Sequence, residues 1–139
     1  MISVIMPVYN NGDVVANTVK SLLAQTYGDF ELLCINDCSP DNSLDVLKRL
    51  EKKDSRIKVY SNETNRGAGY CRNFGLELIK GDYCFFLDGD DYFEPEFLEK
   101  MHTKIVETDA DVCFCNYTFV KTDGTISTYG DVDFTAYES

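Results

Sequence analysis

The stretch FFLDGDDYF at residues 85–93 joins an apolar run to three carboxylates, Asp88, Asp90 and Asp91. The apolar residues predict a buried strand over 82–87. Carboxylates this close repel one another unless they are protonated or neutralised by a cation. Oxygen ligands of this kind suit Mg²⁺ or Mn²⁺. The stretch therefore predicts a sheet strand that ends at a divalent metal site.

The acidic cluster has a second interpretation as a solvated turn, because Asp and Gly are ordinary turn residues. A calcium-binding EF-hand loop does not fit. With Asp88 as its first position, Tyr92 and Phe93 fall where a ligand and the obligatory glycine belong. Mg²⁺ usually accepts one or two protein carboxylates and takes its other ligands from water and phosphate. An acidic protein that handles a diphosphate would need such a cation as a bridge.

Strand-like apolar runs alternate along the chain with apolar residues at helical spacing. The predicted strands cover residues 2–8, 30–35, 57–60, 82–87 and 111–119. The predicted helices cover 13–25, a segment opened by Ser39 and Pro40, 68–79, and a segment opened by Pro95. This alternation predicts a three-layer α/β/α fold with a mostly parallel central sheet.

The loops that follow the predicted strands are polar. Right-handed crossovers place all of these loops at the carboxyl edge of a parallel sheet, which is where open α/β sheets bind ligands. Each of these loops carries Asn or Asp: residues 9–12, 36–39, 62–69 and 88–92. We therefore expect the functional site at this edge.

The chain of 139 residues has a formal net charge of −11. This charge argues against nucleic acid as a partner and against docking on anionic lipid. No apolar run reaches the length of a membrane span, and residues 2–6 read as a strand instead of a signal peptide. We expect a cytoplasmic protein, with any contact to the inner face of the membrane made through the acceptor or through a region beyond this chain.

Most of the six cysteines lie in apolar runs, where a free cysteine behaves as a small hydrophobic residue. This setting favours a reduced protein over a disulfide framework. A zinc site is disfavoured, because the cysteines lack paired CxxC spacing and His102 is the single histidine.

The segment 65–73 follows a predicted strand and opens a helix, so free backbone N–H groups point at whatever binds there. Gly67 and Gly69 permit close approach, and Arg72 can form charge-assisted bonds to phosphate. A dinucleotide fingerprint is disfavoured, since the third glycine is missing and the motif follows the third strand. The alternative is an ordinary helix start with Arg72 facing solvent.

Two further strand ends carry candidate ligand contacts. Asp37 can accept a hydrogen bond from a base or a sugar hydroxyl, or it can cap a helix. Pro7 and Tyr9 can form a platform for a flat ring, or they can belong to the edge of the core.

Four ordered motifs give the chain a resemblance to a known family. They are VIMPVYN at 4–10, NDCSPD at 36–41, NRG at 65–67 with RNFG at 72–75, and FLDGDD at 86–91. In this order they resemble the family-2 glycosyltransferases with a GT-A fold. The resemblance covers residues 2 to about 98, and the chain would be a GT-A fold truncated at its carboxyl side.

The resemblance implies a nucleotide-diphosphate sugar as ligand, usually a UDP sugar, and Mn²⁺ or Mg²⁺ as cofactor. Pro7, Tyr9 and Asp37 would hold the base. Asp88 would lie near the ribose and the metal, and Asp90 would ligate the metal bound to the diphosphate. The other nucleotide-binding residues would be Asn10, Gly67 and Arg72. The implied reaction transfers the sugar, a hexosyl or N-acetylhexosaminyl group, with inversion to a hydroxyl of a saccharide or lipid-linked acceptor, as in polysaccharide biosynthesis.

The sequence departs from the family pattern in its second motif, where Asn36 and Cys38 replace the usual Asp and Gly, and at Cys71, where Ala is common. We assign residues 1–120 to the nucleotide-sugar-binding core and 121–139 to an acidic tail that begins the acceptor side. No residue after Val120 has the setting of a catalytic base, so we expect this piece to bind the donor and to be inactive alone. The alternative is a non-catalytic nucleotide-binding or interaction domain.

Overall fold

The central sheet contains four parallel strands in the order β3-β2-β1-β4. The computed structural model describes residues 1–121, 123–128 and 136–137. The sheet strands are β1 (Ile2–Val8), β2 (Phe30–Asn36), β3 (Ile57–Ser61) and β4 (Tyr83–Phe86). The parallel α/β architecture expected from the alternating pattern is confirmed.

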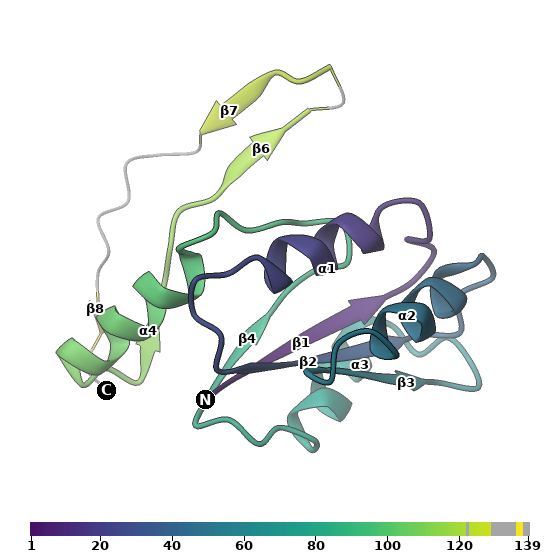
Figure 1. Cartoon of the computed structure of the whole chain (residues 1–139), viewed down its shortest axis with the longest axis horizontal. Helices are drawn as coiled ribbons and strands as arrows, with labels where there is room; N and C mark the ends of the chain where they lie inside the picture. Colours follow the sequence, from purple (N-terminus) through teal and green to yellow (C-terminus); the bar gives the residue numbers. More distant parts are fainter. Residues whose placement is uncertain (122, 129–135, 138–139) are drawn as a thin grey trace. The chain divides into compact units, whose positions relative to one another are not determined.

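Three helices cover this sheet on two faces (Figure 1). α1 (Val15–Leu23) and α2 (Ser43–Glu51) contact each other, whereas α3 (Ala68–Leu76) packs against β1 and β2. The chain steps from β1 to β2 to β3 in one direction and then crosses back to β4 on the far side of β1. Because such crossovers are right-handed, the reversal places α3 on the opposite face from α1 and α2.

The core lies around β1 and β2, which are buried along their whole length. Strands covered on both faces need apolar residues almost throughout, which explains the continuous runs in the sequence. On the α3 side, Ile5, Leu33 and Ile35 form a buried cluster with Cys71. Gly75 of α3 lies so close to the Ile5 side chain that an added Cβ would clash with it. The small residue lets α3 approach the sheet closely.

Two expected helix starts were wrong. Ser39 and Pro40 do not open α2, which begins at Ser43. The Asp41 carboxylate accepts hydrogen bonds from the N–H and the hydroxyl of Ser43, so a side-chain turn precedes the helix. Pro95 likewise precedes α4 (Phe97–Thr108) and does not form its first turn.

The expected fifth strand over 111–119 was also wrong. The run divides into β5 (Val112–Cys113), which pairs antiparallel with β8 (Ala136–Tyr137), and β6 (Thr118–Val120), which pairs antiparallel with β7 (Ile126–Thr128). Phe114 and Tyr117, between β5 and β6, are 57% and 60% exposed. The middle of the run is therefore not buried in a sheet, which is why the apolar pattern misled the assignment.

By internal contacts the chain divides into Met1–Pro95 and Glu96–Ser139. The main sheet with α1 to α3 belongs to the first unit, and α4 with the two small antiparallel pairs belongs to the second. The proposed functional division at residue 120 stays a prediction, and residues 122, 129–135 and 138–139 of its tail lie outside the described residues. Across the part of the chain that the structure describes, no helix has both the length and the apolar character needed to cross a membrane.

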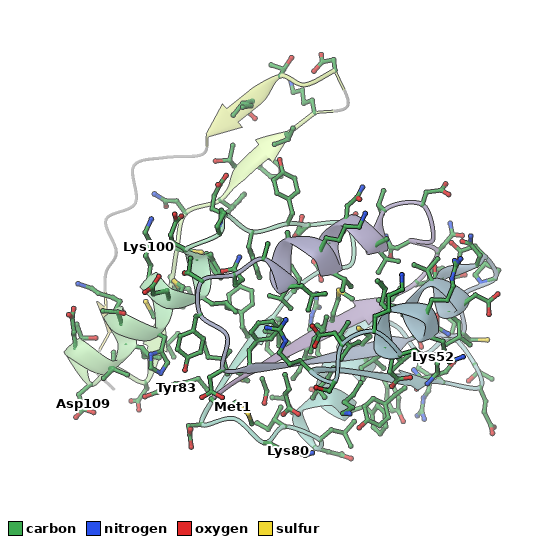
Figure 2. The ribbon with its side chains drawn as sticks, viewed as in Figure 1. Met1, Lys52, Lys80, Tyr83, Lys100 and Asp109 are labelled. Atoms are coloured by element: carbon green, nitrogen blue, oxygen red, sulfur yellow. The ribbon has the colours of Figure 1, made fainter. Side chains whose placement is uncertain are left out.

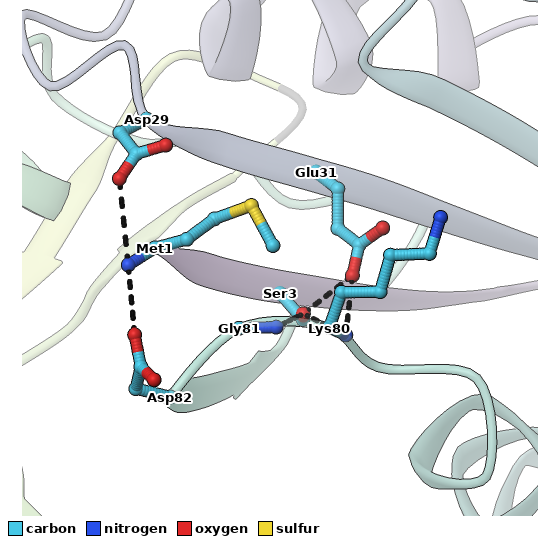
Figure 3. A network of polar contacts seen from close by, with 7 residues as sticks. All are labelled: Met1, Ser3, Asp29, Glu31, Lys80, Gly81 and Asp82. Atoms are coloured by element: carbon cyan, nitrogen blue, oxygen red, sulfur yellow. Dashed lines mark hydrogen bonds and ion pairs between the residues drawn. The ribbon is translucent and has the colours of Figure 1, made fainter.

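A buried polar network fixes the amino edge of the sheet (Figure 3). The Glu31 carboxylate accepts hydrogen bonds from the Ser3 hydroxyl at 2.7 Å and from the Lys80 backbone N–H at 2.7 Å. The Gly81 N–H donates to the Ser3 hydroxyl at 2.9 Å. Figure 2 labels Met1, Lys80 and Tyr83 together at this edge. The network holds the connection between α3 and β4, two elements that both supply residues to the opposite edge.

Candidate functional site

A cavity of about 320 Å³ opens at the carboxyl edge of the sheet, where the ends of β1, β2 and β4 meet the start of α3. It lies next to β1, the strand at which the strand order reverses, as expected for open α/β sheets. The cavity is lined by Pro7, Val8, Tyr9, Asn11, Asp37, Ala68, Arg72, Asp88, Gly89 and Asp90. Six residues singled out from the sequence are thus brought together: Pro7, Tyr9, Asp37, Arg72, Asp88 and Asp90.

The end of β1 contributes an exposed ring and a tight backbone turn. Tyr9 is 49% exposed and lines the cavity, so its side chain is accessible to a ligand. Asn10 adopts φ 57°, a left-handed conformation that Asn tolerates, and its N–H donates to the Ser39 hydroxyl at 3.2 Å. Asn10 itself does not line the cavity. Asn11, which the sequence analysis did not single out, lines it and accepts from the Tyr9 N–H through its side chain.

Asp37 is 3% exposed, and its carboxylate is surrounded by donors. It accepts from the Asn62 side-chain amide at 2.7 Å, from the Arg66 N–H at 2.9 Å and from the Gly67 N–H at 2.7 Å. Burial acts to raise the pKa of Asp37, but these hydrogen bonds outweigh it and lower the pKa below the usual value. Asp37 therefore stays ionised and holds the 62–67 segment at the entrance to α3.

The start of α3 provides the basic side of the cavity. Gly67, at φ 85°, is the turn residue before the helix, and it lies outside the lining. Arg72 is on the second turn of α3, and its guanidinium donates to the Asp88 carboxylate at 2.6 Å. Arg66 points elsewhere, since its guanidinium stacks at 3.7 Å over the ring of Tyr70. Arg72 is the one cationic side chain among the described residues that line the cavity.

The loop after β4 brings two carboxylates to the cavity, Asp88 and Asp90. Gly89 between them passes close to the end of β1, because a Cβ there would lie 3.3 Å from the Pro7 carbonyl oxygen. The Thr18 hydroxyl of α1 donates to the Gly89 carbonyl at 3.0 Å and anchors the loop. Asp91 lies outside the lining. Partial burial, and then the charges of Asp90 and Asp88, raise its pKa.

A complete metal cage of protein ligands is absent from the described residues, in which no group of three or more His, Cys, Asp or Glu side chains could hold a metal. The cavity does offer two exposed carboxylates, Asp88 and Asp90. That donor set fits Mg²⁺ or Mn²⁺, which take one or two carboxylates and complete the coordination shell with water and phosphate. The residues present therefore fit a metal that arrives with a phosphate ligand, and they do not fit a structural metal.

Sequence reasoning missed two residues whose side chains hold the cavity residues in place. Asn62 and Thr18 do not line the cavity, yet they hold Asp37 and the Gly89 loop. Their signal in the sequence is weak. Asn62 directly follows β3, where a polar residue at the carboxyl edge was expected, whereas Thr18 sits in the apolar face of α1 and looks like an ordinary helix residue.

The comparisons with known proteins agree on the family. A family model described as "Glycosyl transferase family 2" matches residues 3–134. The chain is 39% identical over 125 residues to the putative teichuronic acid biosynthesis glycosyltransferase TuaG of Bacillus subtilis, covering 90% of this chain and 50% of TuaG. It is 33% identical over 130 residues to the glycosyltransferase GlyG of Streptococcus pneumoniae, covering 93% of this chain and 43% of GlyG. The chain thus spans half or less of these two relatives.

Solved structures share the fold. S. aureus TarS in complex with UDP aligns with a TM-score of 0.74 and 34% identity, over 79% of this chain and 33% of that chain. The mannosyltransferase PcManGT from Pyrobaculum calidifontis, solved with GDP-Man and Mn²⁺, aligns with a TM-score of 0.73 and 17% identity, over 78% of this chain and 33% of that chain. The expected GT-A type of fold is confirmed, and the chain belongs to glycosyltransferase family 2.

Proposed function

We propose that this chain binds the donor of a glycosyltransferase, a UDP sugar held together with Mn²⁺ or Mg²⁺ in the cavity at the carboxyl edge. The observation that carries the proposal is the meeting of four chain segments in one cavity with an aromatic ring, one arginine and exposed carboxylates. TarS, at 34% identity, was solved with UDP and with UDP-GlcNAc. In a longer chain, the same site would serve inverting transfer of the sugar to a saccharide or lipid-linked acceptor.

Each side of the cavity would take one part of the donor. Tyr9 and Pro7 would contact the flat face of the base, and Asp37 would close the base end. Arg72 would bind phosphate oxygens, because an arginine forms strong charge-assisted bonds to them. Asn10 and Gly67 would support this region through the backbone turns beside it.

Asp90 and Asp88 would hold the divalent cation, which supplies Lewis-acid stabilisation of the charge on the departing diphosphate when it is bound. Without a cation, an acidic chain of net charge −11 repels a diphosphate. The cavity lining itself carries Asp37, Asp88 and Asp90 against a single arginine. Binding of the donor should therefore depend on the metal.

Isothermal titration calorimetry with UDP tests the proposal. Affinity should rise at least about tenfold when Mn²⁺ is added, and Asp90→Ala should remove this increase without loss of the fold. Asp45→Ala is the matched control, because it removes the same charge from an exposed residue of α2 outside the cavity. Equal UDP affinity with and without Mn²⁺ in all three proteins would refute the metal-dependent donor site.

We also propose that these 139 residues bind the donor but transfer no sugar. Among the described residues that line the cavity, the Asp37 carboxylate already accepts hydrogen bonds from three groups, and Asp88 and Asp90 are assigned to the metal. None is left to accept the proton of an acceptor hydroxyl, a step that needs a base within hydrogen-bond reach. Product analysis with labelled UDP sugars, Mn²⁺ and a panel of acceptors should show slow hydrolysis at most. Multiple-turnover transfer would contradict the proposal.

A further inference from the structure

We propose that Arg72 sets the order in which the ligands bind, because it occupies Asp88 until a diphosphate draws it away. The cation would then enter together with the nucleotide and not before it. This inference rests on the proposed donor site. It adds a role that the fold alone does not require: the same arginine that receives the phosphate keeps the metal site closed in its absence.

The ion pair between Arg72 and Asp88 is the geometric basis. The two side chains come from different elements, α3 and the loop after β4, and meet at 2.6 Å within the lining of the cavity. A divalent cation at this place would have Asp88 and Asp90 as its protein ligands, since no third acidic, histidine or cysteine ligand joins them within the described residues. While Arg72 is paired with Asp88, one of these two carboxylates is less available to the cation.

The ion pair between Arg72 and Asp88 lies where a diphosphate can replace Asp88 as the partner of Arg72. The Arg72 side chain is 34% exposed and the Asp88 side chain 55% exposed, and ion pairs this open to water are weak and screened by salt. A diphosphate presents more negative charge than one carboxylate and can take the guanidinium with several oxygens. The guanidinium also lies 6.0 Å from the centre of the Phe86 ring, at the outer limit of a cation–π contact. Phe86 therefore remains a neighbour of Arg72 when the ion pair with Asp88 is broken.

The charges in the cavity explain why the binding of the diphosphate and the binding of the cation are coupled. Arg72 is the one cation among the described residues of the lining, so it neutralises part of the charge of Asp88 and Asp90 in the empty cavity. When it moves to a phosphate, Asp88 is released and can join Asp90 in binding the cation at the moment the phosphate oxygens arrive. Nucleotide and metal should therefore strengthen each other's binding, and loss of Arg72 should weaken that mutual effect.

Electron paramagnetic resonance of free Mn²⁺ measures metal binding without any turnover. For Arg72→Gln in the absence of nucleotide, the Kd for Mn²⁺ should fall roughly threefold to tenfold, in line with removal of one adjacent charge. Arg66→Gln is the matched control. It removes the same charge from the same region, but Arg66 stacks on Tyr70 outside the lining, so its Kd should stay within about twofold of the unmodified chain.

Addition of UDP separates this inference from the proposed function. In the unmodified chain UDP should tighten Mn²⁺ binding, and in Arg72→Gln this tightening should shrink. If UDP has no effect on Mn²⁺ in the unmodified chain, the proposed donor site is wrong. If UDP tightens Mn²⁺ binding in the unmodified chain, but Arg72→Gln and Arg66→Gln have the same Kd for Mn²⁺ without nucleotide, the donor site stands and the role of Arg72 is overturned.

If circular dichroism shows that Arg72→Gln does not fold, Arg72→Met is the second variant, because it keeps an apolar stem near Phe86. The same Mn²⁺ titrations then apply to it.

Discussion

The two edges of the central sheet use polar residues in opposite ways. At the amino edge, Glu31 is 8% exposed and Ser3 is fully buried, and their oxygens are occupied by each other and by the Lys80 and Gly81 backbone. At the carboxyl edge, Tyr9, Asp88 and Asp90 remain exposed around a cavity. Buried polar groups that satisfy one another stabilise a fold, whereas exposed groups that converge on a cavity can bind a ligand. The comparison separates residues that stabilise the fold from candidate ligand-binding residues.

The largest expected effect is on stability and comes from the amino edge. In Gly81→Ala the new Cβ would lie 2.7 Å from the Met1 carbonyl oxygen and 2.7 Å from the Ser3 nitrogen, and backbone atoms cannot easily move aside. We expect a loss of about 3 kcal/mol in the free energy of unfolding, the upper part of the range for overpacking, measured by urea denaturation. UDP affinity of the folded protein should not change.

Gly28→Ala is the control for this substitution, because nothing lies within 4 Å of a Cβ at Gly28. Its stability should stay within about 0.5 kcal/mol of the unmodified chain, as for most surface changes. A Gly81→Ala protein as stable as Gly28→Ala would show that the amino edge is not tightly packed.

Asp37 belongs to both sides of the comparison, since it is buried like the amino-edge residues but lines the cavity. Asp37→Ala removes the acceptor of the Arg66 N–H and the nearer of the two acceptors of the Gly67 N–H, which should lower the free energy of unfolding by about 1–3 kcal/mol. The pKa of Asp37 is lower in the folded state than its ordinary value. Its stabilising effect is therefore complete above that ordinary value, near pH 4, and is lost as pH falls through the folded-state pKa.

Urea denaturation of both proteins across the acid range checks this sign. The stability difference between the unmodified chain and Asp37→Ala should be constant at neutral pH and should shrink below about pH 4. A difference that grows on acidification would contradict the assigned hydrogen bonds. Titration of UDP and of pyrophosphate into Asp37→Ala then tests the base role: that role predicts weaker UDP binding with little change for pyrophosphate.

The smallest expected effect is at Cys38, on the loop after β2. Cys38 adopts φ 54°, a left-handed conformation that disfavours a side chain with a Cβ. Cys38→Gly should raise the free energy of unfolding by about 0.5–1 kcal/mol, because the local strain is removed. Cys38→Ala keeps the Cβ and should bring no gain, so equal stability of the two variants would exclude backbone strain as the cause.

The sequence was sufficient to predict the sheet and the edge that carries the cavity, because buried parallel strands and the polar loops after them leave clear patterns. β1, β2 and β4 ended where their apolar runs ended, within about one residue. The start of α2 was not predictable from Ser39 and Pro40. Several residues in this segment can cap a helix, and only the structure shows that the hydrogen bond from the Ser43 N–H to Asp41 precedes the first helical residue. β5 pairs with β8, a partner far along the chain that a local pattern could not reveal. β6 pairs with the nearby β7 in a short hairpin, which was missed because the pattern of 111–119 predicted one continuous strand.

Of the candidate site residues named from the sequence, Pro7, Tyr9, Asp37, Arg72, Asp88 and Asp90 line the cavity, and their ligand-binding roles stay predictions. Arg72 and Asp88 were expected to face a ligand, but their ion pair depends on how α3 sits beside β4, which no local pattern encodes. The donors around Asp37 likewise come from a segment 25 to 30 residues further along the chain. Contacts of this kind follow from the packed fold and not from the motifs.

The central claim is that the carboxyl edge binds the nucleotide while the amino edge only stabilises the fold. Nuclear magnetic resonance of the amide groups, titrated with UDP and the diamagnetic ion Mg²⁺, tests this claim most directly. We expect the largest shifts at residues 9–12, 37, 66–72 and 88–90, and little change at Ser3, Glu31, Lys80 and Gly81. Shifts centred on those four residues, or no shifts at saturating UDP and Mg²⁺, would contradict the account.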